Sequence, residues 1–198
     1  MNIWPLQFVE RWLARAGPPE PAALIFVLAG REHRKLHALE LYRRGCAPRL
    51  VISVGRFEIR RFEKLPLPVQ LPLREAAATV PAAKRHFFAY FEGDVAEIEA
   101  IPPRRLGTLH EIQALENWLI RRPEITSVLV ITNGVHARRV GLCCQALLDR
   151  RVAVYLTNAP NPSEDGQRPR DGIWKELVKL SAYWVWLALA LGRTRRSK

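Results

Sequence analysis

Short runs of apolar residues alternate along this chain with segments whose apolar residues recur at helical spacing. A run that is apolar at almost every position is typical of a strand in a sheet covered on both faces. Such strands are expected at 23–29, 50–54, 128–132 and 152–157. Helices are expected at 32–44, 109–121 and 136–148. This alternation predicts right-handed crossovers and a mostly parallel sheet with helices on both faces.

The remaining segments are less regular. In chain order we expect an irregular insertion at 56–81, a helix at 82–91, a strand at 95–101, a polar loop at 158–172 and a closing helix at 174–191. The insertion is inferred from its prolines, Pro66, Pro68, Pro72 and Pro81. The length of 198 residues suits a single domain, with a core at 22–191 and a basic tail at 192–198.

The chain carries a formal net charge of +12, which suits nucleic acid, anionic lipid or a phosphorylated ligand as partner. No aromatic-interleaved RNA motif, zinc finger or basic zipper is present, and this argues against nucleic acid. The three cysteines form neither a disulfide framework nor a zinc spacing, so reduced thiols are expected. The segment 1–17 places Trp4 and Phe8 on one helical face and lacks the features of a signal peptide. We therefore expect a cytoplasmic protein.

The end of the closing helix, 180–191, is almost wholly apolar and includes Trp184 and Trp186. Twelve residues of helix are about 18 Å long, well short of the roughly 30 Å hydrocarbon core of a membrane. A basic tail at 192–198 follows this segment. Two alternatives stay open: the helix packs on the sheet, or it lies at the anionic inner face of a membrane as a peripheral contact.

In folds of this kind ligands bind beyond the carboxyl ends of the strands, so the turns at those ends are the candidate sites. The first turn, Ala29-Gly30-Arg31, offers close backbone approach at Gly30 and a cation suited to phosphate at Arg31. The second offers the hydroxyl of Ser53 and the flexible Gly55. Neither GxGxxG nor a phosphate-loop motif occurs in the chain.

Two further turns carry polar side chains. Thr108 and Glu111 form a T-x-x-E sequence, which is typical of a helix capping box. The alternative is that Glu111 faces the ligand as a base or an anchor. In the other turn, Thr132 and Asn133 end a strand, and His136 and Arg139 share one face at the start of a helix. An imidazole and a guanidinium beside backbone N–H donors suit an anion or a phosphoryl group.

Metal and serine-nucleophile chemistry find little support. His33 and His37, spaced i, i+4, form at most half a metal site, and no third ligand can be assigned. No GxSxG motif occurs, and Ser53 has no partner that the sequence identifies.

Several stretches together resemble a bacterial family of unknown function, the YdcF/SanA/ElyC family. The matching stretches are VLAG at 27–30, the segment from Arg34 to Gly55 that includes LYRRGCAPRLVISVG, TLHE at 108–111, VITNGVHARRV at 130–140, and Trp174-Lys175-Glu176 with Tyr183 downstream. The match covers about 160 residues. The family glutamate that follows the second strand corresponds to either Glu58 or Glu75 in this sequence.

The resemblance implies a Rossmann-like three-layer α/β sandwich and a shared ligand site. The implied site residues are Gly30, Ser53, Gly55, Thr108, Glu111, Thr132, His136, Arg139 and the late Glu176. Family members are linked to cell-envelope biogenesis, and one binds S-adenosylmethionine. Two departures stand out, because the glycine-rich first turn is reduced to Ala29-Gly30 and the SGG turn becomes Ser53-Val54-Gly55.

The leading hypothesis is a protein that binds a nucleotide-like or phosphorylated small molecule, with S-adenosylmethionine among the candidates. It would act as a hydrolase or a transferase. His136 would be the acid/base or anion contact, Arg139 the phosphate contact and Glu111 the base or hydroxyl anchor. The alternative is a non-catalytic cell-envelope factor held at the membrane surface, so whether the protein is an enzyme stays open at this level.

Overall fold

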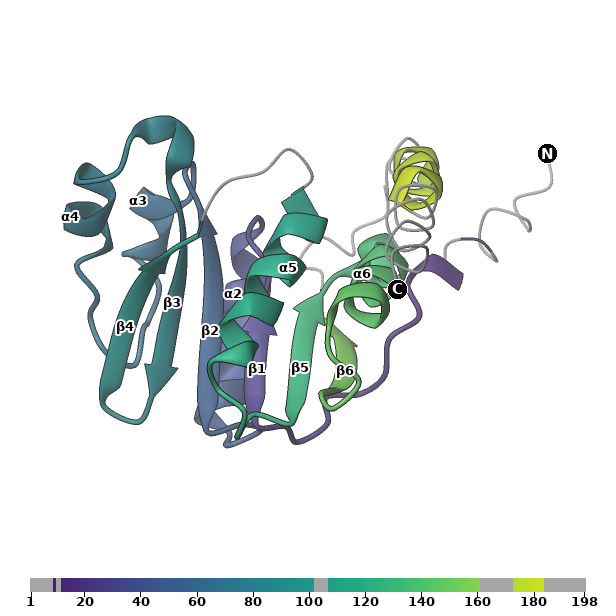
Figure 1. Ribbon diagram of the computed structural model, residues 1–198, viewed down its shortest axis with the longest axis horizontal. Helices are drawn as coiled ribbons and strands as arrows, with labels where there is room; N and C mark the ends of the chain where they lie inside the picture. The colour runs from purple at the N-terminus through teal and green to yellow at the C-terminus, as the bar shows by residue number, and fades with distance from the viewer. Residues whose placement is uncertain (1–8, 10–11, 102–106, 161–172, 184–198) are drawn as a thin grey trace, which may run out of the picture.

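A six-stranded sheet forms the centre of the computed structural model, which describes residues 9, 12–101, 107–160 and 173–183 (Figure 1). Its strands are β1 (Leu24–Val27), β2 (Arg49–Gly55), β3 (His86–Glu92), β4 (Val95–Ala100), β5 (Ser127–Thr132) and β6 (Ala153–Asn158). They lie in the order β4-β3-β2-β1-β5-β6. The four strands β2, β1, β5 and β6 are parallel, whereas β3 is antiparallel to both β2 and β4. The mostly parallel sheet is therefore confirmed.

Helices cover both faces of this sheet. One face packs against α2 (Glu32–Arg43), α3 (Ile59–Phe62) and α4 (Leu73–Ala78), and the other against α5 (Gly107–Ile120) and α6 (Ala137–Leu147). Strand β1 serves both cores, because Ile25 and Val27 belong to the first and Leu24 and Phe26 to the second. The result is a Rossmann-like three-layer α/β sandwich (Figure 1).

The end of α2 shows how the sequence sets an element boundary. Gly45 has a φ of +74° and its N–H bonds to the carbonyl of Tyr42, while the N–H of Cys46 bonds to the carbonyl of Leu41. This pair of bonds is a Schellman motif, which satisfies carbonyls left unpaired at the helix end. It confirms the C-terminal cap expected at Gly45 and turns the chain toward β2.

The helix expected at 82–91 is wrong. Only Ala82–Lys84 is helical, as a single 3₁₀ turn, and His86–Glu92 forms strand β3. Aromatic residues dominate this strand, and five of its seven positions are buried, as a strand packed on both faces requires. A two-residue turn at Gly93 and Asp94 joins it to β4, and Gly93 has the positive φ (+55°) that such tight hairpin turns use. The expected strand at 95–101 is confirmed as β4.

The segment 56–81 is more regular than its prolines indicated. It contains two short helices, α3 and α4, together with six buried apolar side chains that join the core beside α2: Ile59, Phe62, Leu65, Leu71, Leu73 and Ala77. These buried residues offset the entropy of ordering a proline-rich segment. The expectation of an irregular insertion is therefore wrong in part.

Some expectations fall on residues outside the described part of the chain. These are the apolar face formed by Trp4 and Phe8, the closing helix beyond 183 and the basic tail at 192–198. The described part of the closing helix spans 173–183. Among the described residues, no helix combines the length and the apolar character that crossing a membrane would require.

Candidate functional site

The buried charged side chains gather at one edge of the sheet. Within the described part of the chain, the arginine, lysine, aspartate and glutamate side chains that are buried are Arg34, Lys35, Glu111, Arg139 and Glu176. They form what we call the buried-charge cluster. Helices α2 and α6 supply three of them from their first turns, directly after the carboxyl ends of β1 and β5. The other two members, Glu111 and Glu176, come from α5 and from the helix over 173–183.

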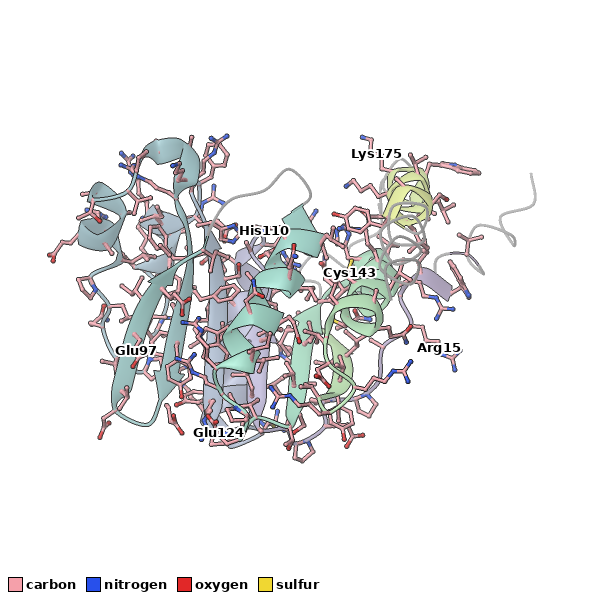
Figure 2. The ribbon with its side chains drawn as sticks, in the orientation of Figure 1. Arg15, Glu97, His110, Glu124, Cys143 and Lys175 are labelled. Carbon is pink, nitrogen blue, oxygen red and sulfur yellow. The ribbon has the colours of Figure 1, made fainter. Side chains whose placement is uncertain are left out.

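Figure 2 shows at which end of the molecule these residues lie. His110, next to Glu111 on α5, and Lys175, next to Glu176, lie toward the end of the molecule where the parallel strands finish. Glu124 lies at the opposite end. Removing a charge from water costs several kcal/mol even after relaxation. Five buried charges at one edge of the sheet therefore cost more free energy than packing of the fold would require.

Glu111 connects α5 to the ends of β1 and β2. Its Oε1 accepts the backbone N–H of Ala29 at 2.7 Å and the hydroxyl of Ser53 at 2.5 Å. The Nε2 atom of His86 lies 2.8 Å from the same hydroxyl and 3.7 Å from Glu111 Oε1. The capping-box interpretation is wrong for the Glu111 side chain, because within the described part of the chain its carboxylate accepts hydrogen bonds from Ala29 and Ser53 and none from the start of its own helix.

Arg34 lies directly above the first turn. Its Nη2 donates to the carbonyl of Ala29 at 2.5 Å, and a Cβ at position 30 would overlap this nitrogen. Gly30 also has a φ of +124°, which side chains rarely tolerate. Burial lowers the pKa of Arg34, Glu111 and Glu58 oppose that shift, and Arg31 and Arg139 add to it. The charges of both Glu111 and Arg139 therefore act on the pKa of Arg34.

The neighbouring Lys35 forms an ion pair with Glu58, which follows β2. Burial lowers the pKa of Lys35, and the Glu58 carboxylate opposes this shift. Glu58 Oε1 lies 3.4 Å from the position that a Cβ on Gly55 would take, so this carboxylate lies against the end of β2. Of the two glutamates that could match the family position, Glu58 is the one that contacts this cluster.

Arg139 ties α6 to two other helices. Its Nε donates to Glu176 Oε2 at 2.9 Å, its Nη1 donates to the hydroxyl of Thr108 on α5, and its guanidinium carbon lies 5.4 Å from the ring centre of Tyr183. Burial favours a higher pKa for Glu176. Hydrogen bonds from His136 and Arg139 outweigh it and lower the pKa to about 2. Arg139 is thus held by the protein, with fewer N–H groups left for a ligand than the sequence indicated.

His136 contacts both members of that ion pair through one ring nitrogen. Its Nδ1 lies 3.0 Å from Glu176 Oε2 and 3.2 Å from Arg139 Nη2. A protonated Nδ1 donates to the carboxylate, whereas an unprotonated Nδ1 accepts from the guanidinium. Both arrangements leave Nε2 pointing away from the pair, on a side chain that is 32% exposed. His136 and Arg139 share one helical face, as their spacing predicted.

The other predicted site residues divide into two groups. Thr132 is fully buried, and neither its hydroxyl nor the Oδ1 of Asn133 has a hydrogen-bond partner among the described residues. Asn158, which was not among the predicted site residues, ends β6 and also has a buried Oδ1 without a partner in this part of the chain. Arg31, in contrast, is exposed and contributes to the site through its charge near Arg34.

Sequence reasoning missed three residues of this region: Arg34, Lys35 and His86. Arg34 opens the longest stretch of the family resemblance, and this was the available signal. His86 was hidden because its segment was assigned to a helix. As the first residue of an antiparallel strand it pairs with Gly55, so its side chain meets the carboxyl end of β2.

The site combines a buried carboxylate, a buried guanidinium and a partly exposed imidazole from three different helices. Such a set can bind an anion and move a proton on a bound group. Among the residues the structure describes, no group of three or more His, Cys, Asp or Glu side chains has the arrangement of a metal site.

Comparison of the chain with protein-family models, with curated proteins and with solved structures finds no match to any of them.

Proposed function

We propose that this protein binds a nucleotide-like or phosphorylated small molecule at the carboxyl ends of its parallel strands, and that it acts on this ligand as a hydrolase or transferase. The observation that carries the proposal is the buried-charge cluster at that edge of the sheet. Buried charges are expensive to a fold and are concentrated where proteins bind or transform polar ligands.

Arg34 supports an anionic ligand. Lys35 and Arg139 each have a carboxylate partner, Glu58 and Glu176. Arg34 has no carboxylate within ion-pair distance among the described residues, and its buried Nε has no hydrogen-bond partner there. A phosphate group beside Arg34 would supply both the missing charge and the missing acceptor.

Glu111 and His136 support chemistry on that ligand. Both hydrogen bonds that Glu111 makes among the described residues end on Oε1. Its second oxygen is the atom that we assign to a ligand proton. His136 is oriented through Nδ1, which leaves Nε2 as the atom for proton exchange. A base and an acid held at the same edge suit transfer of a phosphoryl or related group to water or a hydroxyl.

The family resemblance supports the same site. The stretches that carry it contain all five members of the buried-charge cluster. Under this proposal S-adenosylmethionine is a candidate ligand alongside phosphate esters and diphosphates.

A thermal unfolding experiment tests the binding proposal. The full chain is titrated with inorganic phosphate, p-nitrophenyl phosphate, adenosine diphosphate and S-adenosylmethionine. At about a hundred times Kd, a ligand stabilises the folded state by about 2.7 kcal/mol. We expect at least one compound to raise the unfolding midpoint, and Arg34→Gln to reduce that rise.

Arg44→Gln is the matched control, because Arg44 follows the same helix and its side chain is 66% exposed. It should keep the full ligand effect. An unchanged midpoint with all four compounds, or an equal rise in the Arg34 and Arg44 variants, would refute the proposal.

A second candidate function, contact with an anionic membrane surface, is favoured by the helix over 173–183. Trp174 is 61% exposed and Val178, one turn later, is 69% exposed. Lys175 and Lys179 are also exposed beside them. An exposed tryptophan and an aliphatic residue flanked by lysines suit the interface of an anionic bilayer.

Flotation with vesicles tests this second candidate. We expect the full chain to float with phosphatidylglycerol vesicles and not with phosphatidylcholine vesicles, and the double variant Trp174→Ser/Val178→Ser to float less. Lys84→Ser controls for the loss of an exposed residue elsewhere on the surface. Lys84 lies just before β3, which is separated from β5 and β6 by β2 and β1 in the strand order. Equal behaviour with both vesicle types would exclude this function.

A further inference from the structure

Three side chains from three elements form a continuous hydrogen-bond chain at the edge of the site. His86 begins β3, Ser53 lies near the end of β2 and Glu111 lies in the first turns of α5. Ser53 Oγ is 2.8 Å from His86 Nε2 and 2.5 Å from Glu111 Oε1. Ser53 is fully buried, and the side chains of His86 and Glu111 are only 15% and 7% exposed.

The hydrogen bonds that join these three side chains all run in one direction. A carboxylate oxygen only accepts hydrogen bonds, so the single hydroxyl hydrogen of Ser53 points to Glu111. Ser53 Oγ then accepts from His86, which requires a hydrogen on Nε2. Glu111 Oε1 is filled from the other side by the backbone N–H of Ala29. The chain therefore fixes one carboxylate oxygen with two donors and assigns the protonated nitrogen of His86.

This arrangement differs from a serine-nucleophile site. In such a site the imidazole lies between the serine and the acid and removes the hydroxyl proton. Here the serine lies between the imidazole and the acid, is closed off from solvent, and gives its hydrogen to the carboxylate. Ser53 is a link between two other groups and not the atom that attacks a ligand.

We propose that His86 is a positioning residue of the site: through Ser53 it holds the Glu111 carboxylate with Oε1 fixed, so that Oε2 is presented to an O–H or N–H group of the ligand. This inference rests on the proposed function and deepens it, because it names what orients the base. The ring of His110, centred 5.9 Å from that of His86 at 68°, limits the orientations open to the imidazole.

Imidazole NMR on the ligand-free full chain tests the hydrogen-bond chain. A hydrogen on Nε2 that is held by Ser53 exchanges slowly with water and gives a visible N–H signal, unlike that of a solvent-exposed histidine. We expect one such signal that disappears in His86→Gln and in Ser53→Ala and returns in Ser53→Thr, which keeps the hydroxyl. His37→Gln should leave it unchanged, because His37 lies on α2 and contacts Glu40.

Glutamate labelled with carbon-13 at the side-chain carboxyl gives the second measurement. His86→Gln and Ser53→Ala should move the Glu111 carboxyl signal, which Glu111→Gln identifies by its loss, whereas His37→Gln should not. Circular dichroism of each variant verifies that it folds. The inference is overturned if no imidazole N–H signal depends on Ser53, or if the Glu111 signal ignores His86.

Phosphate titration of the same samples separates this inference from the proposed function. Loss of one charge-assisted hydrogen bond in Arg34→Gln should weaken inorganic phosphate binding about tenfold or more. His86→Gln should leave that affinity within about twofold, because His86 acts on the base and not on the anion. If NMR detects the hydrogen bonds from His86 through Ser53 to Glu111 and the protein binds no anion, only the proposed function is refuted.

Discussion

The guanidinium of Arg34 occupies the space that a side chain at position 30 would need. The position of Arg34 is one reason why this turn needs a glycine. Gly30 supplies the positive φ and the open face, and Arg34 fills that face with a cation held against the carbonyl of Ala29.

Gly30→Ala should therefore weaken both the fold and the site. The strained φ costs of order 1–3 kcal/mol, and the methyl group must displace Arg34. We expect a lower free energy of unfolding in urea and a smaller thermal shift with inorganic phosphate. Gly17→Ala is the matched control, since a Cβ there meets nothing within 4 Å and the backbone is not at positive φ. Equal losses in the two variants would show that Arg34 is not held by this turn.

Glu176 should make stability fall in acid. Folding lowers its pKa from 4.5 to about 2, so its ionised form is favoured in the folded state. A lowered carboxyl pKa stabilises the fold above pH 4.5 and loses this contribution as the pH falls toward 2. The full contribution is about 3 kcal/mol.

Urea unfolding of Glu176→Gln between pH 2 and 7 measures that contribution. The variant should be less stable than the native chain at pH 7 and should approach it in stability near pH 2. Lys179→Gln is the control, because it removes the exposed partner 3.0 Å from Glu176 and leaves His136 and Arg139 in place. A parallel offset between Glu176→Gln and the native chain at every pH would contradict the assignment.

The three thiols should differ in reactivity. Cys143 and Cys144 lie on α6 and are buried in the core, and burial raises the pKa of Cys143 to about 12 and that of Cys144 further. At pH 7 a thiol of pKa 12 is ionised in about one molecule in 10⁵. Cys46 is only half-buried. An aromatic disulfide reagent should label Cys46 alone in the folded chain and all three thiols in urea; rapid labelling of Cys143 when Cys46 is replaced by Ala would contradict this packing.

Trp118 should be the side chain on which α5 depends. It is 1% exposed and lies against Tyr90 of β3, with the Arg122 guanidinium 3.9 Å from its ring centre. Trp118→Ala should lower the free energy of unfolding by about 3–5 kcal/mol, the range for large core truncations. Trp174→Ala, at an exposed position, should change it by less than about 0.5 kcal/mol. Similar urea midpoints for the two variants would place Trp118 outside the core.

The parallel part of the fold was readable from the sequence because strands buried on both faces have no polar positions to confuse the pattern. LIFV in β1 and VLVI within β5 are examples, and Gly45 marked a helix end that the backbone confirms. The antiparallel β3 failed for the opposite reason. Ala82, Ala83 and Lys84 favour helix locally, and only the pairing with β2 makes the following aromatic residues a strand.

The site was predictable as far as local spacing reaches. His136 and Arg139 lie in one turn of helix, so their contact follows from sequence. The partners of Glu111 do not, because Ala29 and Ser53 precede it by 82 and 58 residues. Glu176 was located through family resemblance, while its place beside Arg139 depends on how the helix over 173–183 packs.

The β3–β4 hairpin contributes to the candidate site from the beginning of a strand, whereas a parallel sheet contributes from the ends of its strands. Because β3 runs against its neighbours, its first residue and not its last arrives at the functional edge, and it brings His86 there. Within the sheet, the hairpin pairs with the parallel strands through β2 alone. Exchanging this hairpin would therefore change the partner of Ser53 while Arg34, which lies on α2, and the parallel strands stay in place.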